Sequence, residues 1–332
     1  MIPPVITPPA RMTDFLAAHG WGGAAIVPVA GDASFRRYFR VSDGARTAIL
    51  MDAPPPHEDP RPFLAIARWL LEKGFAAPAI HAADEAAGFV LLEDFGDVRM
   101  RETVDAEPAR ETALYKTAID TLVELAGHAP GDIPPYDRTV YQREAGLFTE
   151  WYCPAIGLVV DEKGYRAAWD AVLEPVLAEP VVVTVLRDYH AENLMLVGDG
   201  LGLLDFQDAL AGHAAYDLVS LLQDARRDVS PELEAAMLAY HGRATGAGAA
   251  FDDAYYVLGA QRNTKIVGIF TRLWKRDGKR RYPALCPRVW TYLERDLMHP
   301  ALAPVAAWFD ANIPPEKRGD PMVVGQSVEE GA

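Results

Sequence analysis

The chain has 332 residues, and at roughly 100–200 residues per domain this length allows two domains or one two-lobed unit. Half of the residues (50%) are hydrophobic and 24% are charged, so the chain can bury a sizeable core and is not a disordered tail. The 32 lysines and arginines against 47 aspartates and glutamates give a net charge of −15, which excludes a surface that binds nucleic acid or anionic lipid in bulk.

Cysteine content and hydropathy further limit the class of protein to which the chain can belong. Cys153 and Cys286 are too few for a disulfide framework, and their spacing fits no zinc motif. Residues 1–16 hold no cationic segment leading into an apolar run, and no uncharged apolar stretch reaches the roughly 18 residues of a membrane span. We therefore expect a cytoplasmic protein without a membrane, nucleic-acid or obligatory protein partner.

The first third of the sequence predicts strands and one helix. Residues 35–41 and 47–51 have the aromatic and β-branched side chains of two strands joined by a Ser-Asp-Gly turn. Residues 63–73 place apolar side chains at helical spacing, and Gly74 is a suitable stop for that helix. Residues 89–92 form a short apolar run that predicts another strand.

Beyond about residue 100 the pattern becomes mainly helical. Residues 114–125 and 266–274 carry the apolar stripes of amphipathic helices, whereas the short apolar runs at 181–186 and 201–206 predict two strands. The sequence therefore predicts an α+β, bilobal fold. A small β-rich N-lobe would span residues 1–95 and a larger helical C-lobe residues 96–332.

The most informative segment is Arg-Asp-Tyr-His-Ala-Glu-Asn at residues 187–193, directly after an apolar strand. Catalytic loops of protein kinases carry an Asp and an Asn five positions apart, and Asp188 and Asn193 have that spacing. Asp205 follows 12 residues beyond Asn193, which leaves room for a hairpin that turns at 198–200. We expect this hairpin to bring the three side chains to one rim.

These residue types suit phosphoryl transfer. The protein's task in that reaction is to position the phosphoryl group and screen its charge, and Mg²⁺ prefers carboxylate and amide oxygens as ligands. A further carboxylate, kept off the metal, can accept the proton of an attacking hydroxyl. Any one of these aspartates alone is as easily explained by a turn or a helix cap. The joint pattern is much harder to explain by structure alone, so it favours catalysis.

This joint pattern resembles the aminoglycoside/choline phosphotransferase family of kinase-like enzymes. Other phrases narrow the resemblance to bacterial kinases that phosphorylate the anomeric hydroxyl of N-acetylmuramate and N-acetylglucosamine in cell-wall recycling. These phrases are GDASFRRYFR (31–40), MDAPP (51–55), LEDFG (92–96), YDLVSLL (216–222) and QRN (261–263). The resemblance covers about residues 12–310. It implies a protein-kinase-like fold, a nucleotide-binding N-lobe, ATP and Mg²⁺ as cofactors, and a small sugar as substrate.

The resemblance also assigns roles to individual residues. It makes Asp188 the catalytic base and makes Asn193 and Asp205 the Mg²⁺ ligands. The hinge at 93–96 would bind adenine and the loop at 31–37 would cover the nucleotide, which gives the candidates Gly31, Ser34, Arg36, Arg37, Glu93 and Phe95. Asp217 and His190 are better explained as structural residues that position the catalytic loop.

The sequence departs from the kinase pattern at one important position. Kinase-like enzymes carry a lysine on the third strand that holds the α- and β-phosphates, but residues 47–52 (Thr-Ala-Ile-Leu-Met-Asp) contain none. A glycine-rich GxGxxG loop is also absent. We therefore expect another cation, either Arg36 or Arg37, to reach the phosphates, with a solvated strand face as the alternative.

Two further segments are candidates for the acceptor site. Arg262 and Lys265 begin a strongly basic region, and a cation there would favour the lactyl carboxylate of N-acetylmuramate. A charged helix face is the simpler explanation of that region. Glu150 and Trp151 offer the carboxylate and aromatic ring that suit a sugar, although a tryptophan in this setting is more often a core residue.

Two other functions stay open at this point. One is a kinase of another small alcohol, such as an aminoglycoside, choline or a homoserine-like compound, because an acidic protein suits a cationic acceptor. The other is a nucleotide-binding pseudokinase, which only the missing strand lysine supports. The presence of Asp188, Asn193 and Asp205 together argues against it.

Overall fold

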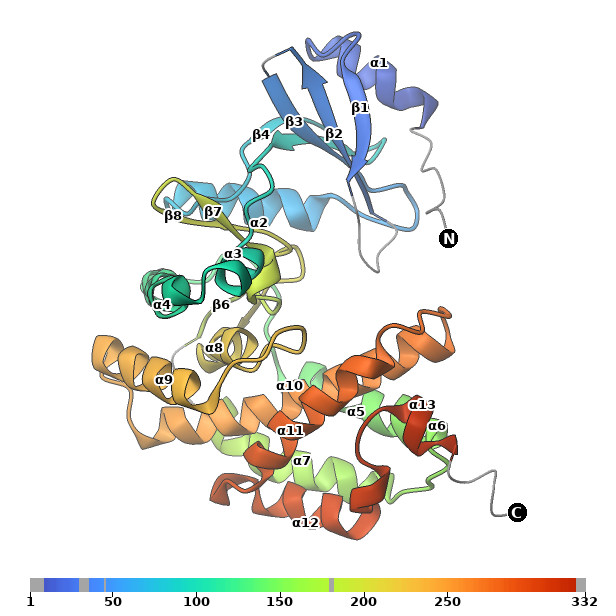
Figure 1. Cartoon of the computed structure of the whole chain (residues 1–332), viewed down its shortest axis with the longest axis vertical. Helices are drawn as coiled ribbons and strands as arrows, with labels where there is room; N and C mark the ends of the chain where they lie inside the picture. Colours follow the sequence, from blue (N-terminus) through green and yellow to red (C-terminus); the bar gives the residue numbers. More distant parts are fainter. Residues whose placement is uncertain (1–8, 30–35, 45, 179–181, 327–332) are drawn as a thin grey trace. The chain divides into compact units, whose positions relative to one another are not determined.

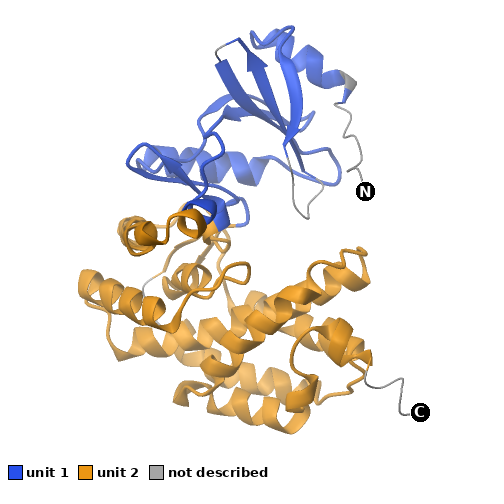
Figure 2. Cartoon of the chain, viewed as in Figure 1, with its two compact units in different colours: residues 1–103, 192–208 blue, residues 104–191, 209–332 orange. Residues whose placement is uncertain are grey.

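The computed structural model describes residues 9–29, 36–44, 46–178 and 182–326. The chain divides into two compact units, which Figure 2 distinguishes by colour. The first unit contains Met1–Thr103 and Glu192–Asp208, and the second contains Val104–Ala191 and Ala209–Ala332. The lobe boundary expected after residue 95 stays a prediction; the compact units divide after Thr103, and residues 192–208 belong to the first unit.

The first unit is built on a five-stranded antiparallel sheet with the strand order β1-β2-β3-β5-β4 (Figure 1). Its strands are β1 (Ala25–Val29), β2 (Arg37–Asp43), β3 (Arg46–Asp52), β4 (Ile80–Asp84) and β5 (Phe89–Glu93). The predicted hairpin is present as β2 and β3, and the predicted strand at 89–92 is β5. Gly44 lies in the turn of the hairpin with a φ of 62°, a backbone conformation that glycine adopts without steric penalty.

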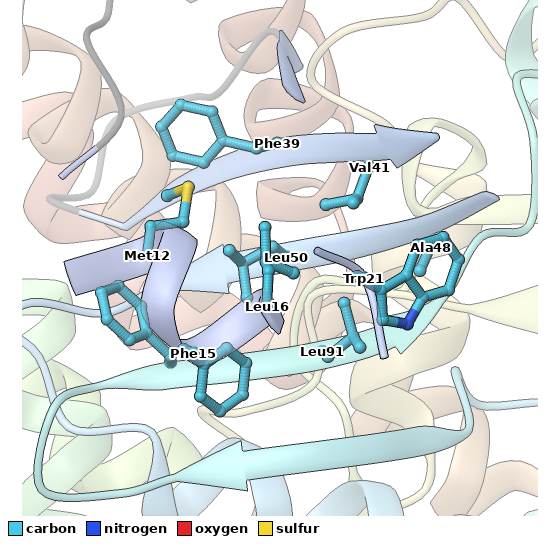
Figure 3. Close-up of a cluster of buried hydrophobic side chains, with 10 residues drawn as sticks. Met12, Phe15, Leu16, Trp21, Phe39, Val41, Ala48, Leu50 and Leu91 are labelled. Carbon is cyan, nitrogen blue, oxygen red and sulfur yellow. The ribbon is translucent and has the colours of Figure 1, made fainter. Parts of the chain in front are cut away.

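One face of this sheet is covered by α1 (Ala10–Ala18), and the interface forms the core of the unit. Figure 3 shows Phe39 and Val41 of β2 and Leu50 of β3 on this face together with apolar side chains of α1. Because side chains alternate along a strand, Tyr38 and Arg40 of β2 lie on the opposite face. The α1 face of β2 is therefore apolar at Phe39 and Val41, whereas the opposite face carries polar side chains at the neighbouring positions.

The predicted helix after the proline-rich segment is α2 (Arg61–Glu72), and its end matches the expected glycine stop. Gly74 has a φ of 88°, and its N–H donates to the carbonyl oxygen of Leu71 over 3.1 Å. The N–H of Phe75 donates to the carbonyl oxygen of Leu70 over 3.0 Å. This pair of bonds is the Schellman motif, which satisfies the last carbonyls of the helix.

A second hairpin, β7 (Leu194–Val197) and β8 (Gly200–Leu203), belongs to the first unit. The N–H of Leu196 donates to the carbonyl of Val98 over 2.8 Å, and the N–H of Leu203 to that of Ala76 over 2.7 Å. These backbone bonds attach the hairpin to the segment before β4 and to the segment after β5. The strand predicted at 201–206 therefore exists but ends at Leu203.

The second unit is mainly helical, with one short antiparallel pair formed by β6 (Val183–Val185) and β9 (Leu210–Gly212). Its longer helices are α4 (Glu111–Ala126), α5 (Arg138–Leu147), α7 (Glu162–Leu177), α8 (Ala215–Leu222), α9 (Pro231–Thr245), α10 (Ala249–Lys275), α11 (Cys286–Leu297) and α12 (Ala303–Asn312). The short ones are η1 (Pro108–Arg110), η2 (Phe148–Tyr152), α6 (Cys153–Ala155), η4 (Pro283–Leu285), η5 (Pro300–Leu302), η6 (Pro315–Lys317) and α13 (Pro321–Val324). The helix α3 (Met100–Ala106) and the turn η3 (Ala191–Asn193) cross from one unit to the other.

The predicted mixture of an antiparallel sheet and a larger helical part is confirmed. The helix predicted at 266–274 is the end of α10, which is 27 residues long and buried over most of its length. None of the helices in the described part of the chain combines the length and hydropathy needed to cross a bilayer.

Gly268 allows α10 to approach the turn η2 very closely. A Cβ atom at this position would lie 2.5 Å from the carbonyl carbon of Leu147 and 2.7 Å from the backbone nitrogen of Phe148. Both atoms belong to the backbone, so they cannot rotate away as a flexible side chain would. Only glycine fits this helix contact.

We expect Gly268→Ala to destabilise the protein by about 1–3 kcal/mol, because the extra methyl group overpacks this contact. Gly146→Ala is the matched control. Gly146 also lies in a helix, but a Cβ there meets nothing within 4 Å, so this variant should be neutral or slightly stabilising. Urea unfolding of both variants tests the expectation, and equal stability of the two would contradict it.

Candidate active site

The loop after β6 is held by a buried carboxylate of α8. Asp217 accepts hydrogen bonds from the backbone N–H groups of Leu186, over 2.6 Å, and Arg187, over 2.8 Å. The hydroxyl of Ser220 donates to the carbonyl oxygen of Arg187 over 2.8 Å. Arg187 itself has a φ of 74°, which is unusual for a residue with a side chain. The backbone immediately before Asp188 is therefore fixed by α8.

Burial raises the pKa of Asp217 to about 7, although its two backbone hydrogen bonds and the charge of Arg262 favour the ionised form. The residue lies in the first turn of α8 and its carboxylate faces the loop backbone. This arrangement agrees with the expectation that Asp217 has a structural role.

The side chain of Arg187 enters a buried cluster built around Glu144 of α5. Glu144 pairs with Arg187 and accepts a hydrogen bond from the hydroxyl of Tyr136, and Lys265 lies 3.2 Å from its Oε2 atom. Burial alone would raise the pKa of Glu144, but the charges of Lys265 and Arg187 outweigh it and lower the pKa. Lys265 also donates to the hydroxyl of Tyr216 over 3.1 Å.

Asp188 lies half-buried among cations of the second unit. Burial alone would raise its pKa, but the positive charges of Lys265 and Arg262 outweigh that effect and lower it. Asp188 is therefore ionised at neutral pH. Arg262 is 3% exposed and Lys265 is 9% exposed, so both cations act within the interior. The Nη1 atom of Arg262 is buried and has no hydrogen-bond partner among the described residues.

His190 lies buried in the same loop. Its Nε2 atom is 3.0 Å from Nη1 of Arg226, which can only donate, so Nε2 accepts and the ring is neutral. Burial lowers the pKa of His190 from its usual 6.5 to about 4, against the opposing charge of Asp224. These contacts suit a histidine that orients the loop.

In the first unit, Asn193 and Asp205 flank the β7–β8 hairpin. The N–H of Leu204 donates to the carbonyl of Asn193 over 3.0 Å and closes the base of the hairpin. As a result Nδ2 of Asn193 lies 3.5 Å from Oδ2 of Asp205, whose Oδ1 accepts a hydrogen bond from Gln207 over 2.8 Å. Asp205 has a φ of 58°, so its backbone is held in a left-handed conformation. Two of the three side chains expected at one rim therefore lie close together in the first unit, whereas Asp188 belongs to the second unit and its convergence with them stays a prediction.

The hinge candidates follow β5. The Glu93 side chain accepts from the N–H of Ala79 over 3.1 Å, which gives it a structural partner. The ring of Phe95 lies against Gly202 of β8, where a Cβ atom would approach it to 2.7 Å. Between them, Asp94 forms an ion pair of 2.7 Å with Arg40 of β2. The segment after β5 is thus anchored to the sheet and to the hairpin.

The nucleotide-loop candidates divide into two groups. Gly31 and Ser34 lie outside the described residues. Arg37 is paired with the buried Asp52 of β3, directly opposite it in the β2–β3 register. Arg36 lies 3.4 Å from Glu58 instead. The two neighbouring arginines therefore have different partners.

Glu150 and Trp151 lie in the turn η2, which packs against α10. Glu150 is exposed and Trp151 is half-buried. Arg262 and Lys265 lie on α10 as well, so all four acceptor-site candidates belong to these two packed elements of the second unit.

Three acidic residues of these networks were missed from the sequence: Glu144, Glu58 and Asp94. Glu144 leaves a recognisable signal, since it is a lone carboxylate between the buried Tyr141 and Ala145 of α5. Glu58 and Asp94 lie in segments without periodicity, where each is one of several acids. Nothing in the sequence distinguishes them from solvated residues.

Comparison with known proteins gives the family. The model of the phosphotransferase enzyme family known as APH matches residues 25–255. A Caulobacter vibrioides protein named N-acetylmuramate/N-acetylglucosamine kinase is 38% identical over an alignment covering 93% of this chain and 98% of its own length. A Pseudomonas aeruginosa protein of the same name is 40% identical, over 85% of this chain and 88% of its own length.

Solved structures show the same fold at low sequence identity. Choline kinase LicA from Streptococcus pneumoniae matches with a TM-score of 0.62 at 12% identity, over 88% of this chain and 97% of its own. The gentamicin complex of APH(2'')-IIa matches with a TM-score of 0.62 at 14% identity, over 90% of this chain and 98% of its own. By sequence and by fold, this chain belongs to the phosphotransferase enzyme family of kinase-like proteins.

Proposed function

We propose that this protein is an ATP-dependent sugar kinase that phosphorylates the anomeric hydroxyl of N-acetylmuramate, N-acetylglucosamine or both. The names of relatives that align over nearly the whole chain support the acceptor, and the family supports the phosphotransfer. The observation that carries the proposal is the position of Asp188, on a backbone fixed by Asp217 and five residues before Asn193, whose side chain lies 3.5 Å from that of Asp205.

In the proposed reaction, the carboxylate of Asp188 accepts the proton of the sugar's C1 hydroxyl. That oxygen forms a bond to the γ-phosphorus of ATP while the bond from this phosphorus to the β–γ bridging oxygen breaks, so the products are a sugar 1-phosphate and ADP. The lowered pKa of Asp188 keeps the carboxylate ionised and able to orient the hydroxyl. Cations packed around it stabilise that charge.

Asn193 and Asp205 fit a divalent cation. A carboxylate oxygen and an amide oxygen are both hard ligands. Rotating the Asn193 side-chain amide by half a revolution exchanges its nitrogen and oxygen and places the oxygen beside Asp205. Among the described residues no group of three or more His, Cys, Asp or Glu side chains could hold a metal by itself. We therefore assign the remaining ligand positions to phosphate and water oxygens, as is common for Mg²⁺. When bound, Mg²⁺ neutralises charge on the nucleotide phosphates.

The nucleotide and sugar would use the remaining candidates. Backbone groups of the segment from Glu93 to Phe95 would bind adenine, and the loop containing Gly31 and Ser34, with Arg36 or Arg37, would cover the phosphates. Of the two cations proposed for the sugar, Lys265 is already engaged by Glu144, whereas Arg262 keeps a spare donor. Glu150 and Trp151 complete the proposed acceptor site. Use of ATP as the donor favours the cytoplasm.

We expect coupled ADP release with N-acetylmuramate and N-acetylglucosamine, because their C1 hydroxyl is the proposed acceptor. The measurement is a coupled assay with Mg-ATP in which these sugars are compared with choline, homoserine and an aminoglycoside. Turnover confined to the cationic compounds would contradict a sugar acceptor, and it would favour the small-alcohol kinase instead.

Replacing the proposed base, Asp188→Asn, should lower kcat by about 10³-fold or more, since the amide cannot accept the hydroxyl proton. Binding of Mg-ATP should change little, and calorimetric titration checks that. Asp199→Asn is the matched control, because Asp199 is exposed in the β7–β8 turn. A kcat for Asp188→Asn within tenfold of the unmodified protein would remove Asp188 as the base.

Burial of neutral His190 predicts a pH dependence of stability. The folded-state pKa of about 4 lies below the usual 6.5, so the unfolded chain binds more protons between these values. The contribution is therefore fully present above pH 6.5 and is lost as the pH falls towards 4, by roughly 3 kcal/mol in total.

Urea unfolding from pH 7 to pH 4 tests this expectation. The His190→Gln variant should lose less stability over that range than the unmodified protein, and His81→Gln, at an exposed position of β4, should behave like the unmodified protein. Parallel curves for the unmodified protein and His190→Gln would contradict the expected role of His190.

A further inference from the structure

The face of the sheet opposite α1 is where a phosphate-binding cation is expected and where β3 has none. On β3, Ala48 and Leu50 pack against α1, so Ile49 and Met51 lie on the opposite face. Neither carries a charge. The missing lysine must therefore be replaced from another segment if the nucleotide phosphates are to meet a cation of this sheet.

The two arginines within β2 already form ion pairs with acidic residues of the first unit. Arg40 lies on the face opposite α1, but it is bound by the carboxylates of Asp94 and Asp97. Arg37 lies on the α1 face, since it shares that face with Phe39 and forms a cross-strand pair with the buried Asp52. Both arginines hold the sheet together.

Arg36, directly before β2, has a different environment. Its side chain is only 12% exposed, and its Nε atom lies 3.4 Å from Oε2 of Glu58. Glu58 precedes α2, which begins at Arg61. Arg36 therefore joins the start of β2 to the segment that leads into α2, as the lysine–glutamate pair of protein kinases joins a strand to a helix.

Tyr38 lies two residues beyond Arg36 at the start of β2 and is half-buried. The charges of Arg36, Asp205 and Glu58 all act on its hydroxyl. Arg36, Glu58 and Asp205 therefore all belong to the first unit, close enough for their charges to act on the same phenol.

We propose that Arg36 replaces the missing strand lysine as the cation that binds the nucleotide phosphates, and that Glu58 is the positioning residue that holds its guanidinium. The proposal rests on the proposed function only in taking ATP as the ligand. A guanidinium suits this task because its fork of N–H donors matches phosphate oxygens, and it keeps its charge at any physiological pH. Glu58 faces the Nε atom of Arg36, and we assign the other N–H groups of the guanidinium to the phosphates.

Nucleotide binding by the full chain tests this proposal without any acceptor sugar. Titrations with Mg-ATP, Mg-ADP and adenosine are compared for the unmodified protein, Arg36→Gln, Arg36→Lys and Arg37→Gln. Arg46→Gln is the matched control, because Arg46 is exposed and paired with Asp43 at the far end of the same hairpin. Thermal unfolding of each variant separates a loss of fold from a loss of contact.

We expect Arg36→Gln to weaken Mg-ATP and Mg-ADP binding by about 10–100-fold, as for loss of a charge-assisted hydrogen bond, and to leave adenosine binding unchanged. Arg36→Lys should restore part of the affinity, and Arg46→Gln should match the unmodified protein. The double variant Arg36→Gln, Glu58→Gln should bind Mg-ATP no more weakly than Arg36→Gln alone, because Glu58 acts through Arg36.

Equal losses for ATP and adenosine, or a large loss of ATP affinity in Arg37→Gln but not in Arg36→Gln, would overturn the assignment. Independent, additive losses from Glu58→Gln would overturn its role as the positioning residue. If the unmodified protein binds Mg-ATP but phosphorylates no sugar, the proposed acceptor fails while these binding ratios still decide the role of Arg36.

Discussion

The carboxylate of Asp217, buried in α8, is the interaction on which the rest of the candidate site depends. Its two oxygens accept the backbone N–H groups of Leu186 and Arg187, and this fixes an otherwise unfavourable backbone conformation just before Asp188. From that fixed point Arg187 turns into the cluster around Glu144, which in turn engages Lys265 of α10. A few buried charges therefore fix the position of Asp188 and keep its carboxylate ionised.

Ion pairs of partly buried side chains also fix the position of β2 in the first unit. Arg37 with Asp52 and Arg40 with Asp94 use opposite faces of β2, so the strand is anchored on both sides. Arg36, directly before β2, pairs with Glu58. Because side chains alternate between the two faces of a strand, each arginine meets the acids on its own face. Those acids decide whether the arginine holds the sheet together or can bind a ligand.

Local features of the fold could be predicted from the sequence because they depend on near neighbours. The glycine stop at Gly74 after α2, the β2–β3 hairpin and the β7–β8 hairpin that brings Asn193 near Asp205 are of this kind. The partner of Arg36 could not be predicted, since two arginines share one motif and Glu58 lies far along the chain. Assignment of residues 192–208 to the first unit likewise depends on bonds to Ala76 and Val98, which no local pattern encodes.

Phosphorus NMR of the product formed from N-acetylmuramate and Mg-ATP tests the central claim most directly, because it reports both transfer and position. The account predicts a new phosphomonoester resonance coupled to the anomeric proton, together with one equivalent of ADP. Formation of inorganic phosphate alone, or of an ester coupled to another sugar proton, would contradict transfer to the C1 oxygen.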